Sequence, residues 1–283
     1  MSERETTPAR HDPAIAFIGG GNMARSLIGG LIARGRAATS IRAADPNGES
    51  RAALAHDFGI RVDADNAVAA DGAAIWVLAV KPQVMAAVCA SLRELAQAQH
   101  PTIVSIAAGI TSAQIDACLG GGQAIVRCMP NTPALLGAGA TGVFANAAVG
   151  NAAHAQVMAL MAAVGISVPI GDEALMDVVT AVSGSGPAYV FLLAEAWQAA
   201  AQAQGLSAEA ARALVNQTLL GAARMLLETD EPASTLRQRV TSPGGTTHAA
   251  IEQLQREGFA GMIERAIDAA TRRGAELAAS APV

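Results

Sequence analysis

The chain contains few aromatic residues, few cysteines and little charge. Aromatic residues make up 3% of its 283 residues, charged residues make up 15%, and there are three cysteines. Because Cys89, Cys118 and Cys128 form no CxxC pair, we interpret them as small buried hydrophobic residues in a reducing compartment. The histidines are scattered without the spacing of metal ligands, so the sequence predicts no metal site.

A basic surface and a membrane segment are also missing from the sequence. The net charge is -5, which provides no positive field for nucleic acid. Apolar runs such as Ala73–Val80 are far shorter than the roughly 20 residues of a membrane-spanning helix. No secretory signal follows Met1, and the polar residues 1–12 are expected to be a flexible tail. We therefore expect a soluble cytoplasmic protein without a nucleic-acid or membrane partner.

Short apolar strands alternate with helices in the first part of the chain. Strands are expected at 14–18, 41–44, 60–62, 73–80, 102–106, 124–128, 143–145 and 166–168. Helices are expected at 22–34, 51–58, from Pro82 onward, at 111–119 and at 151–164. This alternation is typical of a parallel, doubly wound sheet, so we predict an α/β, Rossmann-like domain over residues 13–170.

The remainder, residues 171–283, is expected to be an all-α domain. It contains no convincing strand, and helices are expected at 187–204, 207–228, 247–257 and 259–279. Their apolar stripes are rich in Ala, Leu and Met, and several of the helices are long for a domain of this size. Because such apolar faces need a partner to cover them, we predict a homodimer through this domain.

Three consecutive glycines, Gly19 to Gly21, join the first strand to the first helix. Gly19 permits a tight turn, Gly21 lets the backbone approach a pyrophosphate, and the following residues, Asn22 and Met23, open a helix whose N–H groups favour an anion. The alternative is a tight turn without a ligand. The strand before and the helix after favour dinucleotide binding.

Asp45, at the end of the second strand, bears on which dinucleotide is used. A carboxylate there accepts hydrogen bonds from the ribose hydroxyls and repels a 2′-phosphate, which favours NADH. Asp45 is alternatively a turn-forming residue before Pro46, and Arg42 and Arg51 are candidates for a 2′-phosphate. The sequence therefore leaves both NADPH and NADH open.

Further candidates follow later strands at the same edge of the sheet, where ligands bind in open α/β folds. Ala79 and Lys81 follow the fourth strand, and Lys81 is either a phosphate or ribose contact or an ordinary solvated lysine. Ala107 and Gly109 follow the fifth strand. Their small size leaves room for a nicotinamide ring, although close helix–strand packing needs the same residues. A stiff loop with two prolines, residues 127–133, follows the sixth strand.

The run Ser-Pro-Gly-Gly-Thr-Thr at residues 242–247 precedes a helix of the second domain. Ser242 is expected to be the N-cap, and the glycines and threonines expose successive N–H groups. Such a helix start can hold a carboxylate without an arginine. The alternative is a capped helix without a ligand.

Taken together, these runs resemble the Δ1-pyrroline-5-carboxylate reductase family. The residues that carry the resemblance are 17–24, 79–82, 104–109, 127–133, 182–189 and 242–247. They occur in the family's order and extend over nearly the whole chain. The last two runs are specific, whereas the glycine run alone would not be.

The resemblance implies NAD(P)H-dependent reduction of the C=N bond of Δ1-pyrroline-5-carboxylate to proline. It implies a helical domain that interlocks with a second subunit, in a family that often forms pentamers of dimers. It further implies that Thr247 hydrogen-bonds the substrate nitrogen and that Asn66 lies near the adenosine ribose. The expected substrate residues are Met129, Ser242, Gly244, Gly245, Thr246 and Thr247. The expected cofactor residues are Gly19, Gly21, Asn22, Met23, Asp45, Asn66, Ala79, Lys81, Ala107 and Gly109.

The chain departs from the family pattern at three positions. Ala199 and Gln238 stand where the family usually has acids, and Asp45 replaces the small residue of many NADPH-using members.

Two alternative functions remain. Other two-domain reductases typically use a lysine in the helical domain, and no lysine follows Lys81, which counts against them. A dinucleotide-sensing scaffold without catalysis is the alternative from another functional class.

Overall fold

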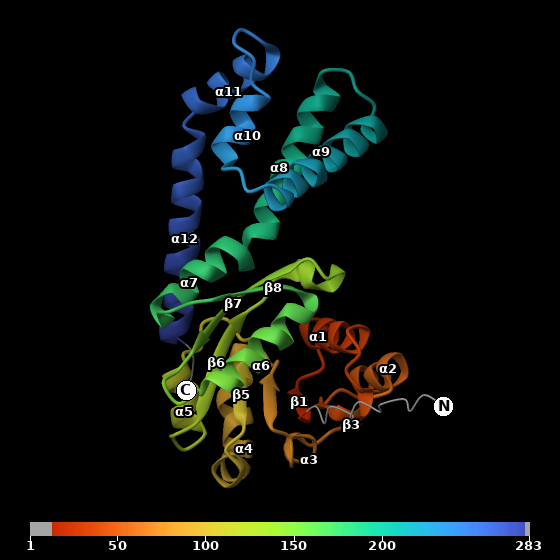
Figure 1. Ribbon diagram of the computed structural model, residues 1–283, viewed down its shortest axis with the longest axis vertical. Coiled ribbons are helices and arrows are strands. Elements are labelled where there is room, and N and C mark those ends of the chain that lie inside the picture. Colours follow the sequence, from red (N-terminus) through yellow and green to blue (C-terminus); the bar gives the residue numbers. More distant parts are fainter. Residues whose placement is uncertain (1–12, 281–283) are drawn as a thin grey trace, which may run out of the picture. The chain divides into compact units, whose positions relative to one another are not determined.

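A computed structural model describes residues 13–280 (Figure 1). The chain forms two compact units. The first contains the residues up to Gly184 together with those from Ala270 onward, and the second contains Ser185–Ala269. Residues 1–12, which we expected to form a tail, lie outside the described part of the chain.

The first unit contains an eight-stranded sheet in the order β3-β2-β1-β4-β5-β6-β7-β8. The strands are β1 (Ile15–Ile18), β2 (Ile41–Ala44), β3 (Arg61–Asp63), β4 (Ile75–Leu78), β5 (Thr102–Ser105), β6 (Ala124–Met129), β7 (Gly139–Ala145) and β8 (Gly165–Pro169). The expected parallel sheet is confirmed for every pair except β6 with β7, which is antiparallel. The connection from β6 to β7 contains only the short turn η3 (Thr132–Leu136), and a parallel pair needs a much longer crossover.

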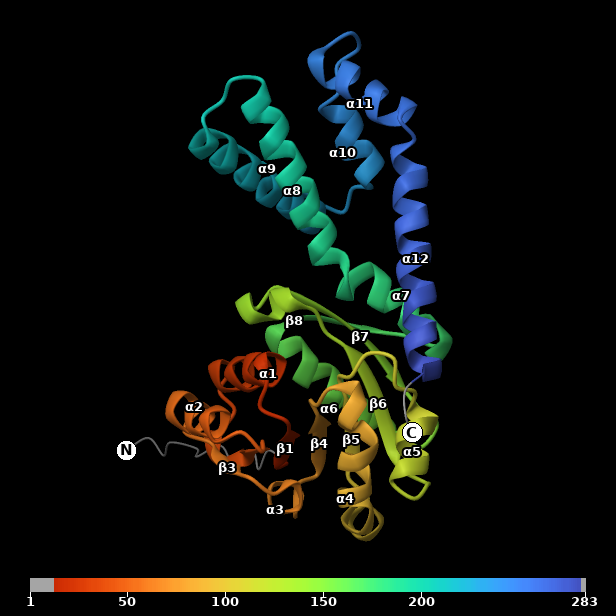
Figure 2. The same ribbon diagram turned by 180° about the vertical axis from the view of Figure 1, so that it is seen from behind.

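Helices cover both faces of the sheet, which confirms the doubly wound fold. The alternation of side chains along β1 places Ile15 and Phe17 in one core cluster and Ala16 and Ile18 in the other. The first cluster includes residues of α1 (Asn22–Ala33), α2 (Gly48–Phe58) and α6 (Asn151–Met161). The second includes residues of α3 (Asn66–Ala70), α4 (Met85–Gln99) and α5 (Ser112–Cys118). Figures 1 and 2 show α6 and α4 on opposite sides of the sheet.

Two local differences from the expected elements have clear causes. Helix α2 begins at Gly48 rather than Arg51, because the side chain of Asn47 caps it by accepting from the N–H groups of Glu49 and Ser50. Pro82 opens a short 3-10 turn, η2 (Pro82–Val84), before α4 begins at Met85. The short helix α3 was not expected at all.

The segment after β8 stays with the sheet, and the compact units therefore divide later than residue 170. It contains η5 (Glu173–Leu175), α7 (Met176–Val179) and the π-helical turn η6 (Thr180–Gly184). Two sets of hydrogen bonds tie this segment to the sheet, one through Glu173 and one through Asn131. The sequence prediction placed the boundary where the strand pattern ends, at β8. That pattern carries no information on the side-chain hydrogen bonds that hold the next segment to the sheet.

The second unit is helical. Its helices are α8 (Gly186–Ala203), α9 (Ala208–Glu228), α10 (Ala233–Arg239), α11 (Thr246–Arg256) and the first part of α12 (Phe259–Ser280), whose end from Ala270 belongs to the first unit. We did not expect α10. No strand occurs among the described residues after Pro169.

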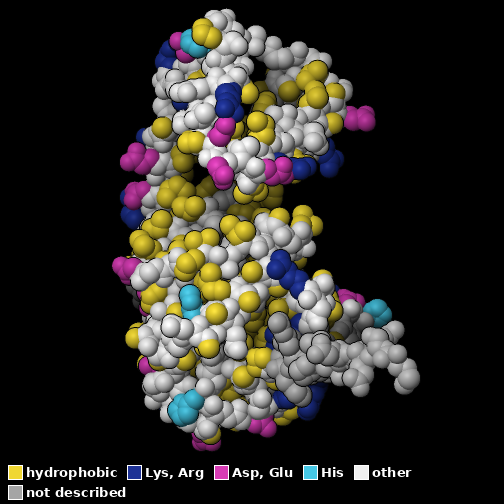
Figure 3. Space-filling view, in the orientation of Figure 1, with side chains coloured by type: hydrophobic (Ala, Val, Ile, Leu, Met, Phe, Trp, Pro, Cys, Tyr) yellow, Lys and Arg dark blue, Asp and Glu magenta, His cyan; other side chains and the backbone are white. Residues whose placement is uncertain are grey.

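Large apolar side chains remain uncovered on the second unit. None of the residues of α8 is buried, and Phe191 and Leu192 are each 66% exposed. Figure 3 shows hydrophobic side chains gathered over the surface of this unit. Among the described residues, the stretch Glu173–Ala203 is long and apolar enough to cross a membrane by length and composition alone. Such a face requires either a protein partner or lipid to cover it.

Candidate functional site

The residues predicted to bind a cofactor meet at one edge of the sheet. Strands β1, β2, β4 and β5 run parallel, so their carboxyl ends lie at the same edge. Gly19, Asp45, Ala79 and Ala107 each follow one of these strands. This is the edge where open α/β sheets bind ligands.

The glycine loop is held tightly between strands. Gly19 has a φ of 103°, in the left-handed region, and a Cβ added to it would lie 2.6 Å from the carbonyl oxygen of Ala79. Its N–H donates to the carbonyl of Ala44 at 2.8 Å. Only glycine is compatible with both the conformation and the close approach to the end of β4.

The N-terminus of α1 faces open space. Gly21 is the N-cap, and no side chain caps the helix there. A Cβ added to Gly21 would meet no atom within 4 Å, and Asn22 is exposed. The first N–H groups of a helix have no partner within the helix. An uncapped, open helix start behind a glycine turn is therefore suited to bind a diphosphate.

The side chain of Asp45 forms a hydrogen bond with the glycine loop, a contact that the sequence did not reveal. Its Oδ2 accepts from the N–H of Gly20 at 2.7 Å, and its Oδ1 accepts from the N–H of Asn47 at 2.8 Å. Asn66 begins α3, directly after β3, which pairs with β2. The half-buried Asp45 and Asn66 thus belong to neighbouring strand ends, and their contact with a ribose stays a prediction.

The other predicted cofactor residues at this edge have different surroundings. Lys81 is exposed and precedes η2, while Ala107 is buried and donates its N–H to Ser105 Oγ at 3.3 Å. Gly109 has a φ of 73°, and a Cβ added to it would lie 3.4 Å from the main-chain nitrogen of Ala278 at the end of α12. The left-handed backbone therefore favours glycine at this position, while the space beside α12 would admit a Cβ in ordinary contact.

A partly buried ion pair between Arg127 and Glu173 joins β6 to the start of α5. Glu173 Oε1 accepts from Ser112 N at 2.6 Å and from Arg127 Nη1 at 2.8 Å, and Glu173 Oε2 accepts from Ser112 Oγ at 2.6 Å. Burial opposes ionisation of Glu173, but the bonds from Ser112 and the Arg127 guanidinium outweigh it and leave the pKa of the carboxyl below its usual range.

Sequence reasoning missed Glu173, although one signal pointed to it. Arg127 lies in the middle of a buried strand, and its side chain is 8% exposed. Because a buried guanidinium needs a carboxylate partner, an acid from elsewhere in the chain had to lie against β6.

Met129 and Asn131, at the end of β6, contact the π-helical turn. The amide of Asn131 donates to the carbonyl of Ser183 at 3.0 Å and accepts from Ala140 N at 2.9 Å. A Cβ added to Gly184 would lie 2.6 Å from Met129 Cε, so the end of the Met129 side chain packs against Gly184 and would have to move if this residue were larger. Asn131 therefore joins the loop after β6 to both β7 and η6.

The predicted substrate loop lies in the second unit, at the start of α11. The N–H of Gly245 donates to the carbonyl of Ser242 at 3.0 Å, which closes a turn. Gly245 is the N-cap, without a side-chain hydrogen bond, so the expectation that Ser242 caps this helix was wrong. Thr246 and Thr247 are the first two residues of α11 and are exposed. The helix start is thus left with N–H groups that no side chain caps.

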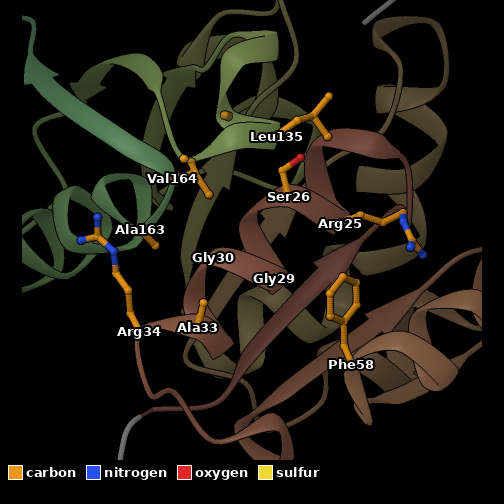
Figure 4. Close-up of a pocket in the computed structure, with 12 residues that line it drawn as sticks. Arg25, Ser26, Gly29, Gly30, Ala33, Arg34, Phe58, Leu135, Ala163 and Val164 are labelled. Carbon is orange, nitrogen blue, oxygen red and sulfur yellow. The ribbon is translucent and has the colours of Figure 1, made fainter. Parts of the chain in front are cut away.

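A groove of about 510 Å³ beside α1 is separate from these residues (Figure 4). It is lined by residues such as Gly29, Gly30 and Phe58, and it contains none of the predicted site residues. The guanidinium of Arg25 at its edge forms an ion pair with Asp57 and lies 5.3 Å from the ring centroid of Phe58. Among the described residues, no group of three or more His, Cys, Asp or Glu side chains is placed to hold a metal ion.

Two family models match the chain. Residues 173–277 match a model described as pyrroline-5-carboxylate reductase dimerisation, and residues 14–109 match one described as coenzyme F420-dependent NADP oxidoreductase. A pyrroline-5-carboxylate reductase of Pseudomonas aeruginosa is 53% identical over 94% of this chain and 97% of its own length. One of Haemophilus influenzae is 43% identical over 93% of this chain and 97% of its own length.

Solved structures agree with these relatives. A pyrroline-5-carboxylate reductase from Coxiella burnetii has a TM-score of 0.91 and 42% identity, and the match covers 94% of this chain and 98% of that one. A Plasmodium falciparum pyrroline carboxylate reductase with NADP bound has a TM-score of 0.82 and 28% identity, with the same coverage of both chains.

Proposed function

Because the chain belongs to the pyrroline-5-carboxylate reductase family, we propose that it reduces the C=N bond of Δ1-pyrroline-5-carboxylate with NAD(P)H to give L-proline. The observation that carries the proposal is the uncapped start of α1 behind a glycine turn, at the carboxyl edge of a doubly wound sheet. The 53% identity to the Pseudomonas aeruginosa enzyme over 94% of the chain supports the same reaction.

The residues at the sheet edge fit a nicotinamide dinucleotide. The open space at Gly21 and the N–H groups that begin α1 suit its diphosphate, and Asp45 and Asn66 suit its adenosine ribose. Lys81, Ala79 and Ala107 would complete the cofactor site. When bound, the reduced nicotinamide supplies the hydride that reduces the C=N bond.

The loop before α11 is assigned two tasks in this proposal. The N–H of Gly245 is used within the turn, so the N–H groups of Gly244 and Thr246 bind the substrate carboxylate. An uncapped helix start is a favourable site for an anion. Thr247 is the next residue, and its side-chain hydroxyl forms a hydrogen bond with the ring nitrogen of the substrate. This bond orients the nitrogen and keeps its proton in place. A threonine hydroxyl is too weak an acid to release this proton by itself, so it fixes geometry or relays a proton from solvent.

We propose that a second copy of the chain covers the exposed faces of α8 and α9. The match of residues 173–277 to a dimerisation model supports a protein partner over lipid for the apolar stretch Glu173–Ala203. In this arrangement the partner's loop before α11 completes the active site, and five dimers assemble into a decamer.

Light scattering on the purified protein would give the mass, and a monomer at micromolar concentration would contradict the proposal.

The cytoplasm is the proposed location. The three cysteines are free, and Cys89 and Cys128 are buried, which supports a reducing compartment. Burial raises the pKa of the Cys89 thiol to about 12, so this residue stays protonated and unreactive at neutral pH.

The rate of NADPH and NADH oxidation by the purified protein tests the reaction. We expect oxidation only when pyrroline-5-carboxylate is present, with proline formed in equal amount. A folded protein that binds a dinucleotide but oxidises none with this substrate would contradict the proposal and favour a dinucleotide-sensing scaffold.

A further inference from the structure

The corner between β2 and α2 bears directly on the choice between NADH and NADPH. The carboxylate of Asp45 is fixed there by two backbone N–H groups, those of Gly20 at 2.7 Å and Asn47 at 2.8 Å. One bond reaches each oxygen, and a carboxylate offers about four acceptor sites. Both oxygens therefore keep a lone pair for a ribose hydroxyl while the negative charge stays at the edge of the glycine loop.

The two arginines near this corner are engaged with main-chain carbonyls. Arg51 donates through Nη1 to the carbonyl of Asp45 at 2.7 Å and to that of Pro46 at 2.9 Å. Arg42 donates through Nη1 to the carbonyl of Asp71, which precedes β4 at the opposite, amino-terminal edge of the sheet. Arg42 is therefore directed to the other edge of the sheet, and Nη1 of Arg51 is already used by main-chain carbonyls of the corner itself.

The N-terminus of α2 is a third group that can hold a phosphate in other proteins, and here it is satisfied within the chain. Asn47 Oδ1 accepts from Glu49 N at 2.8 Å and from Ser50 N at 3.2 Å. Glu49 also adds a negative charge to the first turn of the helix. The capped, acidic start of α2 thus contrasts with the uncapped start of α1.

We propose that this corner selects NADH over NADPH, with Asp45 as the residue that determines the preference. The inference rests on the proposed function, because it requires a nicotinamide dinucleotide at the glycine loop. The 2′-phosphate of NADPH replaces a hydroxyl donor with a group of nearly two negative charges. Asp45 then loses a hydrogen bond and faces a like charge, so we expect NADH to bind about tenfold tighter or more.

Fluorescence titration of the purified protein with NADH and with NADPH, at one ionic strength and without substrate, tests the selection independently of turnover. In Asp45→Asn the side chain keeps its size and loses its charge. We expect the ratio of the two dissociation constants to shift toward NADPH by about tenfold or more. Asp71→Asn is the matched control, because it removes the same charge at the amino-terminal edge of the sheet, and its ratio should equal that of the wild type.

The outcomes distinguish this inference from the proposed function. Tighter binding of NADPH by the wild type, or an unchanged ratio in Asp45→Asn, would overturn the selection and leave the reductase proposal in place. A selective loss of NADPH binding in Arg51→Ala would also overturn it, because Arg51 would then be a phosphate ligand. Binding of neither dinucleotide by the folded protein would overturn both.

Discussion

Replacing Thr247 with alanine is expected to lower kcat roughly 100-fold while NAD(P)H still binds. A group that orients a reacting atom or moves a proton contributes about 10²–10⁴ to a rate. Thr247 is exposed at the start of α11, so the substitution removes no buried contact and should leave the protein folded. Steady-state kinetics with pyrroline-5-carboxylate, together with fluorescence titration of the cofactor, would separate the two effects.

Two further variants make the Thr247 experiment specific. Thr247→Ser keeps the hydroxyl and should restore most of the lost turnover. Thr39→Ala removes another exposed threonine, one in the turn η1 (Ala38–Ser40) of the first unit, and should turn over like the wild type. Unchanged kcat in Thr247→Ala would remove this residue from the mechanism.

Replacing Glu173 with glutamine is expected to lower the free energy of unfolding by about 3 kcal/mol at neutral pH. The substitution leaves the guanidinium of Arg127, which is 8% exposed, without its carboxylate. It also turns amide hydrogens toward Ser112, which presently donates two bonds to Glu173. Urea denaturation at one fixed protein concentration would measure the change.

The pH dependence of this difference follows from the lowered pKa of Glu173. The folded protein holds the carboxyl ionised more strongly than the unfolded chain does. The stabilisation is therefore complete above the unfolded pKa of about 4.3 and is lost as the pH falls through the lower folded value. The difference in the free energy of unfolding between wild type and Glu173→Gln should accordingly decrease below about pH 4.

Glu228→Gln is the control for the Glu173 experiment. Glu228 pairs with Arg224 at 2.7 Å on α9, but the two side chains are 59% and 65% exposed. Exposed pairs of this kind contribute at most about 0.5 kcal/mol. An equal decrease in the free energy of unfolding of the two variants would show that the hydrogen bonds of Glu173 stabilise the fold no more than a surface ion pair does.

The strongly patterned part of the fold was predictable from the sequence. The apolar strand that ends at Gly19 and the helix that begins at Asn22 give both the glycine loop and its position, and the structure has both elements there. The antiparallel β7 was missed because direction depends on the length of the turn before it. The segment 173–184 was missed because it is held by side chains distant in sequence.

The candidate site was predictable to a similar degree. Residue types and strand ends placed Asp45 at the correct edge, but its bond to Gly20 joins two loops and leaves no periodic signal. The cap of α11 was assigned to Ser242 because serine is a common N-cap. In the structure the carbonyl of Ser242 accepts from the N–H of Gly245 and closes a turn. Gly245 is therefore the N-cap, and the helix begins at Thr246.

The contact between Gly109 and the end of α12 has a consequence for the order of folding. The main chain of Ala278 packs on that loop, so the first unit contains the last turns of the last helix. At about 5–20 residues per second, the ribosome needs roughly 10 to 30 s to make the intervening chain. During that interval the loop at Gly109 stays uncovered in the nascent sheet, and its later contact with α12 closes one very long loop.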